Sequence, residues 1–224
     1  MCRNAIRNFP PGTYHLILIN LFDEKCDHLL FIEHNGHYIG CADNGLITMI
    51  LEEEPQKITA LTLEKNQPRN ILYCTGIFAK AFGKLASGIP FAEIGYPDIS
   101  IKVKNPLKPM LGNNWIEGQI IFIDNFENVI VNISKEEFEE QRKGRKFSIV
   151  FKRDESIEKI SETYADVPEG EKIALFNAAG YLEIAINKGN AAGLLFGLMG
   201  YREEPNNPYL QNRLFYNVVK IFFE

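Results

Sequence analysis

The chain has 224 residues, enough for two modest domains, and its composition (46% hydrophobic, 24% charged) is typical of globular proteins. The formal net charge is −5 and no basic stripe is present, which argues against a nucleic-acid partner. The first nine residues, MCRNAIRNF, lack the apolar core of a signal peptide, and no apolar run has the length of a membrane span. We therefore expect a cytoplasmic protein without a membrane partner. Its four cysteines form no C-x-x-C pair and are expected to be free thiols.

The first part of the chain alternates helical and strand patterns. Residues 1–8 have the pattern of a helix that FPPGT stops, because proline cannot continue a helix, and YHLILIN (14–20) predicts a strand. HLLFIEHNGHYIGCADNG (28–45) predicts a hairpin, since Asn-Gly favours a type I′ turn. Helical patterns follow in GLITMILEEE (45–54) and GIFAKAFGKLASG (76–88). These elements predict an α/β layer with too few strands for a self-sufficient sheet.

No group of residues in the sequence has the spacing of a metal site. The four histidines, His15, His28, His34 and His37, all lie in the first forty residues, but no second pair of ligands accompanies them. We expect His34 and His37 to be surface residues that flank the hairpin turn. The sequence therefore implies neither a metal nor a cofactor.

A proline-rich segment, residues 95–112, predicts the entry to a second domain, so we place the domains at 1–94 and 95–224. Short runs of strand character with turn residues between them follow it: WIEGQIIFID, NVIVNIS, KFSIVFK, KIALFN and GYLEIAIN. This spacing predicts a β-barrel or a sandwich. One helix interrupts the strands, with Ser134 and Glu137 placed as a capping box. NRLFYNVVKIFFE (212–224) predicts a final amphipathic strand.

Standard catalytic signatures such as G-x-S-x-G, G-x-x-x-x-G-K-[ST] and H-E-x-x-H are absent. Three segments place polar residues among the apolar runs that predict strands. They are IDNFENVIVNI with Asp124, Asn128 and Asn132, ETYADVPEGE with Tyr164, and FNAAGYLEIAINKGNAAGLLFG with Asn177, Glu183 and Asn190. Asparagine amides can pair with a purine edge, a loop aromatic can stack on a base, and small residues let a ligand approach the backbone. In the alternative interpretation these asparagines are only turn and cap residues.

IDNFENVIVNI, TYADVPEGEKIALFNAAGYLEIAINKGNAAGLLFG, FPPGTYHLILIN and GHYIGCADNGLITMIL closely resemble segments of the S-adenosyl-L-methionine (SAM) hydroxide adenosyltransferase family. These SAM hydrolases are kin of the SAM-dependent fluorinase and chlorinase. The resemblance implies an α/β N-terminal domain, here incomplete, and a C-terminal all-β barrel. It also implies a homotrimer that binds SAM between the N-terminal domain of one subunit and the C-terminal domain of its neighbour. Water or halide then attacks the ribose C5′ and releases L-methionine, with SAM as substrate and no cofactor.

The resemblance places the substrate-binding positions mainly in the C-terminal domain. Asn128, in the segment that begins with Phe126, falls on the asparagine that pairs with adenine, and Tyr164 falls near the aromatic residue that stacks on it. Asp124 falls on an acidic position near the methionine end. The backbone of Ala178 and Ala179 falls on the segment around the methionine group. Three residue types depart from the family pattern: Ala178 replaces a serine, Glu127 the glycine of FGN, and Val131 a threonine.

The catalytic positions of the N-terminal domain have changed in type. Family members use an Asp, an Arg and a His to position and activate water, and the resemblance aligns these with Asn20, Asp27 and Tyr73. An amide has no useful basicity, and Asp27 reverses the charge of the arginine. The leading hypothesis is slow hydrolysis of SAM to adenosine and L-methionine. The alternatives are a non-catalytic adenosine- or SAM-binding homologue and a degenerate fragment.

Family members also begin with a strand like ITLLTDFG, then a helix and another strand, none of which is evident here. We expect a truncated or misannotated start, with strands supplied by another chain as the alternative. Either case predicts an exposed apolar edge in the first half of this chain.

Overall fold

The computed structural model describes residues 2–22, 26–97, 99–152 and 155–224. Contacts divide the chain into two compact units, Met1–Pro106 and Leu107–Glu224. The predicted boundary lies after residue 94, whereas hydrogen bonds join the residues that follow it to the first unit. The Lys102 backbone N donates to Asp43 Oδ1 (2.9 Å) and the Lys104 backbone N to Thr48 Oγ1 (2.9 Å).

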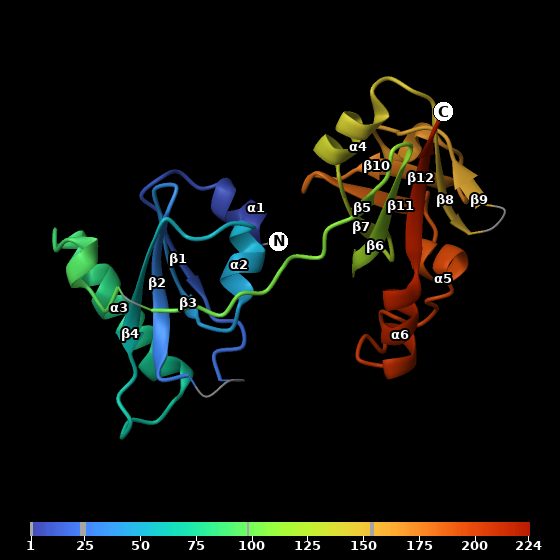
Figure 1. Cartoon of the computed structure of the whole chain (residues 1–224). Helices are drawn as coiled ribbons and strands as arrows, with labels where there is room; N and C mark the ends of the chain where they lie inside the picture. The colour runs from blue at the N-terminus through green and yellow to red at the C-terminus, as the bar shows by residue number, and fades with distance from the viewer. Residues whose placement is uncertain (1, 23–25, 98, 153–154) are drawn as a thin grey trace. The chain divides into compact units, whose positions relative to one another are not determined.

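The first unit is a four-stranded sheet with helices on both faces (Figure 1). Its elements in chain order are α1 (Cys2–Arg7), β1 (Tyr14–Ile17), β2 (His28–His34), β3 (His37–Ala42), α2 (Leu46–Leu51), β4 (Lys57–Thr62), α3 (Ile71–Ala86) and the 3-10 turn η1 (Phe91–Glu93). The strand order is β1-β3-β2-β4; β1 is parallel to β3 and the other pairs are antiparallel. The predicted α/β layer is therefore confirmed.

Alternation along β2 explains why both faces of this sheet are covered. Leu30 and Ile32 belong to a buried cluster with residues of α1 and α2, whereas Leu29 and Phe31 belong to a second cluster with Phe78 of α3. Side chains of a strand point alternately to opposite faces, so a strand that is apolar throughout needs a layer on each side.

The edge strand β1 leaves apolar side chains exposed, as expected for this sheet. The exposed residues at and just beyond this strand are Tyr14, Leu16, Leu18 and Ile19. The predicted strand over 14–20 ends early, at Ile17. Asn20 has φ +49°, a left-handed conformation that does not continue a strand.

The expectation that His34 and His37 are surface residues is wrong. The hairpin turn lies at Asn35 and Gly36 as predicted, both with positive φ, but His34 is only 6% exposed and His37 only 8%. The pairing of β1 with β3 buries His37, because it brings His15 Nε2 within 3.1 Å of His37 Nδ1.

The second unit is a nearly closed antiparallel barrel, which confirms the predicted C-terminal fold (Figure 1). Its elements in chain order are β5 (Met110–Leu111), β6 (Trp115–Ile123), β7 (Val129–Ser134), α4 (Lys135–Arg142), β8 (Phe147–Lys152), β9 (Glu155–Ile157), η2 (Tyr164–Asp166), β10 (Lys172–Phe176), β11 (Tyr181–Ile186), α5 (Ala191–Phe196), α6 (Pro208–Tyr216) and β12 (Val218–Phe223). The strand order is β10-β11-β7-β6-β12-β8-β9, and β5 pairs with β6. A bridge from Ile160 to Ala174 links the two ends of this order.

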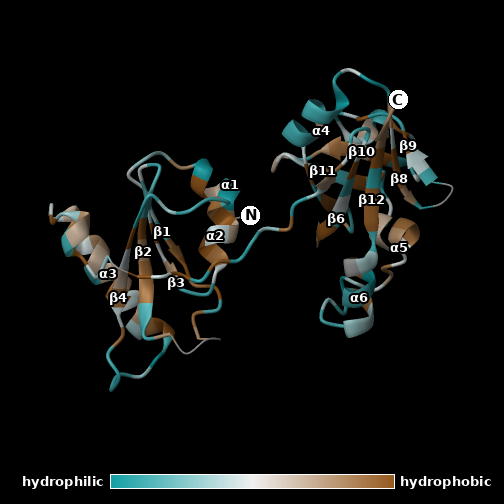
Figure 2. Cartoon of the chain, viewed as in Figure 1, coloured by the Kyte–Doolittle hydropathy of each residue, from teal (hydrophilic) through white to brown (hydrophobic). Residues whose placement is uncertain are grey.

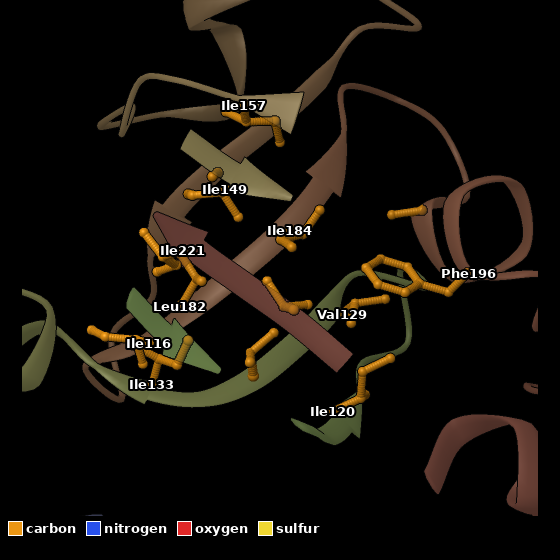
Figure 3. Close-up of a cluster of buried hydrophobic side chains, with 14 of the residues drawn as sticks. Ile116, Ile120, Val129, Ile133, Ile149, Ile157, Leu182, Ile184, Phe196 and Ile221 are labelled. Carbon is orange, nitrogen blue, oxygen red and sulfur yellow. The ribbon is translucent and has the colours of Figure 1, made fainter. Parts of the chain in front are cut away.

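Inward-pointing aliphatic side chains fill the barrel. Ile116, Val129, Ile184 and Ile221 are fully buried and come from four different strands, and Figure 3 shows them converging on one another. The helix α4 stays outside this core except for Phe138, and its hydrophilic colour in Figure 2 agrees with the acidic, solvated face that its sequence predicts. The predicted capping box of Ser134 and Glu137 begins this helix.

The expected strand over residues 212–224 is wrong in its first half. Helix α6 occupies Pro208–Tyr216, and only Val218–Phe223 is a strand. Asn207 Oδ1 accepts a hydrogen bond from the Tyr209 backbone N (3.0 Å), and Pro208 at the first helical position has the φ that a helix needs. No helix in the described part of the chain combines the length and hydrophobicity needed to cross a membrane.

Candidate functional site

The turn between β6 and β7 is organised by Asp124. Its Oδ1 accepts hydrogen bonds from the backbone N of Phe126 and of Asn128 (2.8 Å each), and its Oδ2 accepts one from Asn128 Nδ2 (3.2 Å). Glu127 occupies a left-handed position at φ +62°, which favours glycine. Asp124 thus fixes both the turn and the amide of Asn128, which is only 5% exposed.

A tyrosine and a glutamate meet beside this turn. The Tyr164 hydroxyl donates a hydrogen bond to Glu183 Oε1 at 2.5 Å, and Glu183 is only 4% exposed. Burial of the phenol raises the pKa of Tyr164, and its bond to Glu183 and the negative charges of Glu183 and Asp124 raise it further, whereas Asn128 lowers it. The phenol is therefore a proton donor here. Glu183 is thus a structural partner of Tyr164, and this bond accounts for a carboxylate within an otherwise apolar strand.

The segment after β11 forms the opposite wall and is tied to the Tyr164 loop. Asn187 Nδ2 donates to the Val167 carbonyl (2.8 Å), and the Asn187 carbonyl accepts from the Gly170 backbone N (2.9 Å). Asn190 caps α5, since its Oδ1 accepts from the Gly193 backbone N at 2.5 Å. These asparagines support the wall instead of pointing free amides at a ligand.

Together these segments line an open cavity of about 720 Å³, within the size range of small-molecule sites. Its lining residues are Asp124, Asn125, Phe126, Glu127, Asn128, Tyr164, Ile186, Asn187, Lys188, Gly189, Asn190 and Arg202. Phe126 is 78% exposed and Tyr164 is 44% exposed, so both aromatic rings are accessible to a ligand. A buried amide, a carboxylate and two accessible aromatic rings suit a planar heterocycle with donors and acceptors on its edge.

The structure brings four of the six predicted substrate-binding residues to this cavity: Asp124, Phe126, Asn128 and Tyr164. Ala178 and Ala179 lie elsewhere, in the exposed turn between β10 and β11, where Asn177 Oδ1 accepts from the backbone N of Ala179 (3.0 Å). Strand β11, six residues or about 20 Å long, separates this turn from the cavity wall.

Asn132, in the first of the three polar segments of the sequence, IDNFENVIVNI, has a structural role. Its Oδ1 accepts from the Gln119 backbone N (2.7 Å), and its Nδ2 donates to the Leu107 carbonyl (2.9 Å). Sequence reasoning missed Lys188, Gly189 and Arg202 as lining residues. The only pattern that could have indicated Lys188 and Gly189 is the Gly/Asn-rich sequence around them, and no pattern indicates Arg202.

In the first unit, Asn20 follows β1, Asp27 directly precedes β2 and Tyr73 lies in the first turn of α3. Strand pairing puts the end of β1 and the start of β2 at the same end of the sheet. The carbonyl of Asn20 accepts from Asn44 Nδ2 (3.2 Å), and the carbonyl of Asp27 accepts from the Leu63 backbone N (2.8 Å). The Tyr73 hydroxyl accepts a hydrogen bond from the backbone N of Glu64, the residue after Leu63 (2.9 Å). The Tyr73 hydroxyl therefore already holds a loop in place.

Asp27 carries a negative charge at the start of β2. Its Oδ1 lies 2.9 Å from His28 Nδ1, and this hydrogen bond is the main cause that holds the pKa of Asp27 below its usual range. The other ring nitrogen of His28 lies 3.2 Å from Oδ2 of the buried Asp43. Ligand atoms of Cys26, Asp27 and His28 all lie within 4.8 Å of one another, a grouping that sequence reasoning missed.

Two family models match the chain. The model of the SAM hydroxide adenosyltransferase N-terminal domain matches residues 1–95, and the model of the C-terminal domain of the same family matches residues 118–199.

Curated relatives carry the name (R)-S-adenosyl-L-methionine hydrolase. The relative from Thermus thermophilus is 29% identical over 169 residues, which cover 69% of this chain and 60% of the relative. The relative from Methanocaldococcus jannaschii is 25% identical over 199 residues, which cover 85% of this chain and 70% of the relative. The chain thus spans about three fifths to seven tenths of the length of these relatives.

Solved structures share the fold. An uncharacterized conserved protein from Thermotoga maritima superimposes with a TM-score of 0.70 at 22% identity, over 99% of this chain and 81% of that one. A conserved hypothetical protein from Thermus thermophilus gives a TM-score of 0.62 at 20% identity, over 99% of this chain and 78% of that one. At these identities the likeness shows the fold alone.

Proposed function

Because this chain belongs to the SAM hydroxide adenosyltransferase family, we propose that it binds SAM and hydrolyses it to adenosine and L-methionine. The names of the curated relatives support this proposal, since both are SAM hydrolases. The observation that carries it is the cavity of the second unit, in which Asp124 holds the buried amide of Asn128 beside two accessible aromatic rings.

The cavity chemistry suits the adenosyl half of SAM. The Asn128 side chain is buried, and its amide can both donate and accept hydrogen bonds, as the edge of adenine requires. The rings of Phe126 and Tyr164 offer stacking surfaces for the base. The carboxylate of Asp124 supplies negative charge for the sulfonium group, which carries the positive charge of the substrate.

In the proposed reaction, water attacks the ribose C5′ and the bond from C5′ to sulfur breaks. The electron pair of that bond leaves with L-methionine as a neutral thioether, and the attacking water loses one proton to the solvent. None of the three residues at the family's catalytic positions is a strong base: Asn20 is an amide, Asp27 is a carboxylate of lowered pKa, and the Tyr73 hydroxyl binds Glu64. We therefore expect slow turnover.

We further propose that the chain acts as a homotrimer in the cytoplasm, with SAM held between neighbouring subunits. The resemblance to the family supports the trimer. The four cysteines, all of which are free, support a reducing compartment. Light scattering of the purified chain tests the trimer: a mass of three chains is expected, and a monomeric mass at working concentration contradicts it.

A second candidate function is binding of SAM or adenosine without turnover. The changed residue types at Asn20, Asp27 and Tyr73 are the reason to test it, because the cavity of the second unit does not depend on them. The names of the curated relatives support hydrolysis instead. One experiment separates the two candidates. SAM is incubated with the protein, adenosine is measured by chromatography, and adenosine binding is measured by calorimetry. Release of adenosine above the buffer control supports hydrolysis, and binding without release supports the second candidate. If the protein neither releases nor binds adenosine, both candidates are contradicted.

A further inference from the structure

A group of metal-ligating side chains lies in the first unit, at the start of β2. Cys26 Sγ lies 3.8 Å from His28 Nδ1, and Asp27 Oδ1 lies 2.9 Å from the same nitrogen. All three ligand atoms lie within 4.8 Å of one another. In a tetrahedral zinc site, bonds of about 2.0 Å to nitrogen or oxygen and about 2.3 Å to sulfur put neighbouring ligand atoms roughly 3.3–3.6 Å apart. The two separations that involve His28, 2.9 and 3.8 Å, lie on either side of this spacing.

A buried carboxylate orients the histidine of this group. Asp43 is only 3% exposed; its Oδ2 lies 3.2 Å from His28 Nε2, and its Oδ1 accepts from the Lys102 backbone N (2.9 Å). Without a metal, Nδ1 of His28 faces Asp27 and Nε2 faces Asp43. A metal bound at Nδ1 would take the place of the proton there, while a proton on Nε2 would still be donated to Asp43. This carboxylate–histidine arrangement is the usual outer support of a metal-bound imidazole.

The ligand group also has an accessible side. Cys26 and His28 are partly exposed and line a cavity of about 170 Å³. The Asp27 side chain is 82% exposed, so it can adjust to an incoming ion. Three protein ligands beside a small cavity leave room for water at a fourth position.

We propose that Cys26, Asp27 and His28 bind one zinc ion, with Asp43 as the residue that orients His28. A thiolate, an imidazole and a carboxylate form a ligand set that prefers Zn²⁺ to Mg²⁺ or Ca²⁺, which bind oxygen ligands. The ion would neutralise the charge of Asp27. The proposal is independent of SAM binding.

The test uses the full chain, free of affinity tags and stripped of metal, with no SAM present. Zn²⁺ is titrated by calorimetry, and Co²⁺ is added in a parallel sample to record the charge-transfer absorption that a cobalt–sulfur bond produces. One equivalent of Zn²⁺ and this absorption band are expected for the wild type. Cys26→Ser and His28→Ala are expected to abolish the band and weaken Zn²⁺ binding at least tenfold.

Two further variants make the test specific. Cys2→Ser changes another partly exposed cysteine outside this group, and it is expected to leave Zn²⁺ binding unchanged. Asp43→Asn is expected to weaken binding by about 10- to 100-fold, the usual effect of losing an outer-shell partner. The proposal is overturned if the wild type binds no Zn²⁺, or if Cys26→Ser and His28→Ala bind it as tightly as the wild type. Circular dichroism of each variant confirms that it is folded.

Discussion

The hydrogen bond from Tyr164 to Glu183 is expected to stabilise the second unit, and Tyr164→Phe removes it without changing the ring. Glu183 is 4% exposed, so the variant leaves a buried carboxylate with one partner fewer. A hydrogen bond to a charged group contributes about 1.5–3 kcal/mol. Tyr164 itself is 44% exposed, which places the expected loss near the lower end, at about 1.5–2 kcal/mol.

Burial of the Tyr164 phenol, together with the same contact, predicts that stability depends on pH. The folded state raises the pKa of Tyr164 above its usual value of about 10, so the folded state favours the protonated phenol. The resulting stabilisation is fully present below pH 10 and is lost as the pH rises through the folded-state pKa. In Tyr164→Phe this part of the loss at high pH is expected to disappear.

Urea unfolding followed by tryptophan fluorescence measures both effects, because the single tryptophan, Trp115, lies on β6 of the second unit. Tyr209→Phe is the matched control, since Tyr209 is 65% exposed on α6. A loss below about 0.5 kcal/mol for Tyr164→Phe, or an unchanged response to alkaline pH, refutes the role assigned to this contact.

Three further predictions concern the turn and the core of the second unit. Asn128→Ala is expected to weaken adenosine binding about tenfold or more in calorimetry, because one base-pairing amide contributes about 1–3 kcal/mol, whereas the exposed Asn66→Ala leaves it unchanged; equal affinities contradict the adenine role. Glu127→Gly removes the strain of a non-glycine residue at φ +62° and is expected to raise the free energy of unfolding by about 0.5–1 kcal/mol. The control Glu140→Gly, inside α4, is expected to lower it by about 1 kcal/mol. A lower free energy of unfolding in Glu127→Gly contradicts strain at this turn. Phe138→Ala, which empties a fully buried position, is expected to cost about 3–5 kcal/mol in urea unfolding, and a cost below about 1 kcal/mol contradicts its place in the core.

Local signals in the sequence were sufficient for most of the fold. Three local patterns appear in the structure where they were predicted, because each depends on only a few neighbouring residues. They are the Asn35–Gly36 turn, the capping box of Ser134 and the short strand-like runs after residue 112. The prediction of the final strand was wrong in its first half because the apolar residues of α6 were interpreted as the alternating pattern of a strand. The stronger signal was Asn207 followed by Pro208, a helix start.

The candidate site was predictable only in part. Asp124 and Asn128 share a five-residue turn, so their cooperation follows from sequence distance alone. The bond between Tyr164 and Glu183 spans 19 residues, and the approach of Asp43 to His28 spans 15; both depend on strand pairing that no local pattern reveals. The histidines of the hairpin were misplaced for the same reason, since β1 comes from outside the hairpin and covers His37.

Hydrolysis of SAM in water labelled with oxygen-18 tests the central claim most directly. The protein is incubated with SAM, and mass spectrometry determines whether the adenosine formed contains the heavy oxygen at its 5′ position. Attack of water at C5′ predicts adenosine that carries one oxygen-18 atom, together with an equal amount of L-methionine, at a rate that falls in Asn128→Ala. Absence of adenosine above the buffer control, or adenosine without the label, contradicts the proposed reaction.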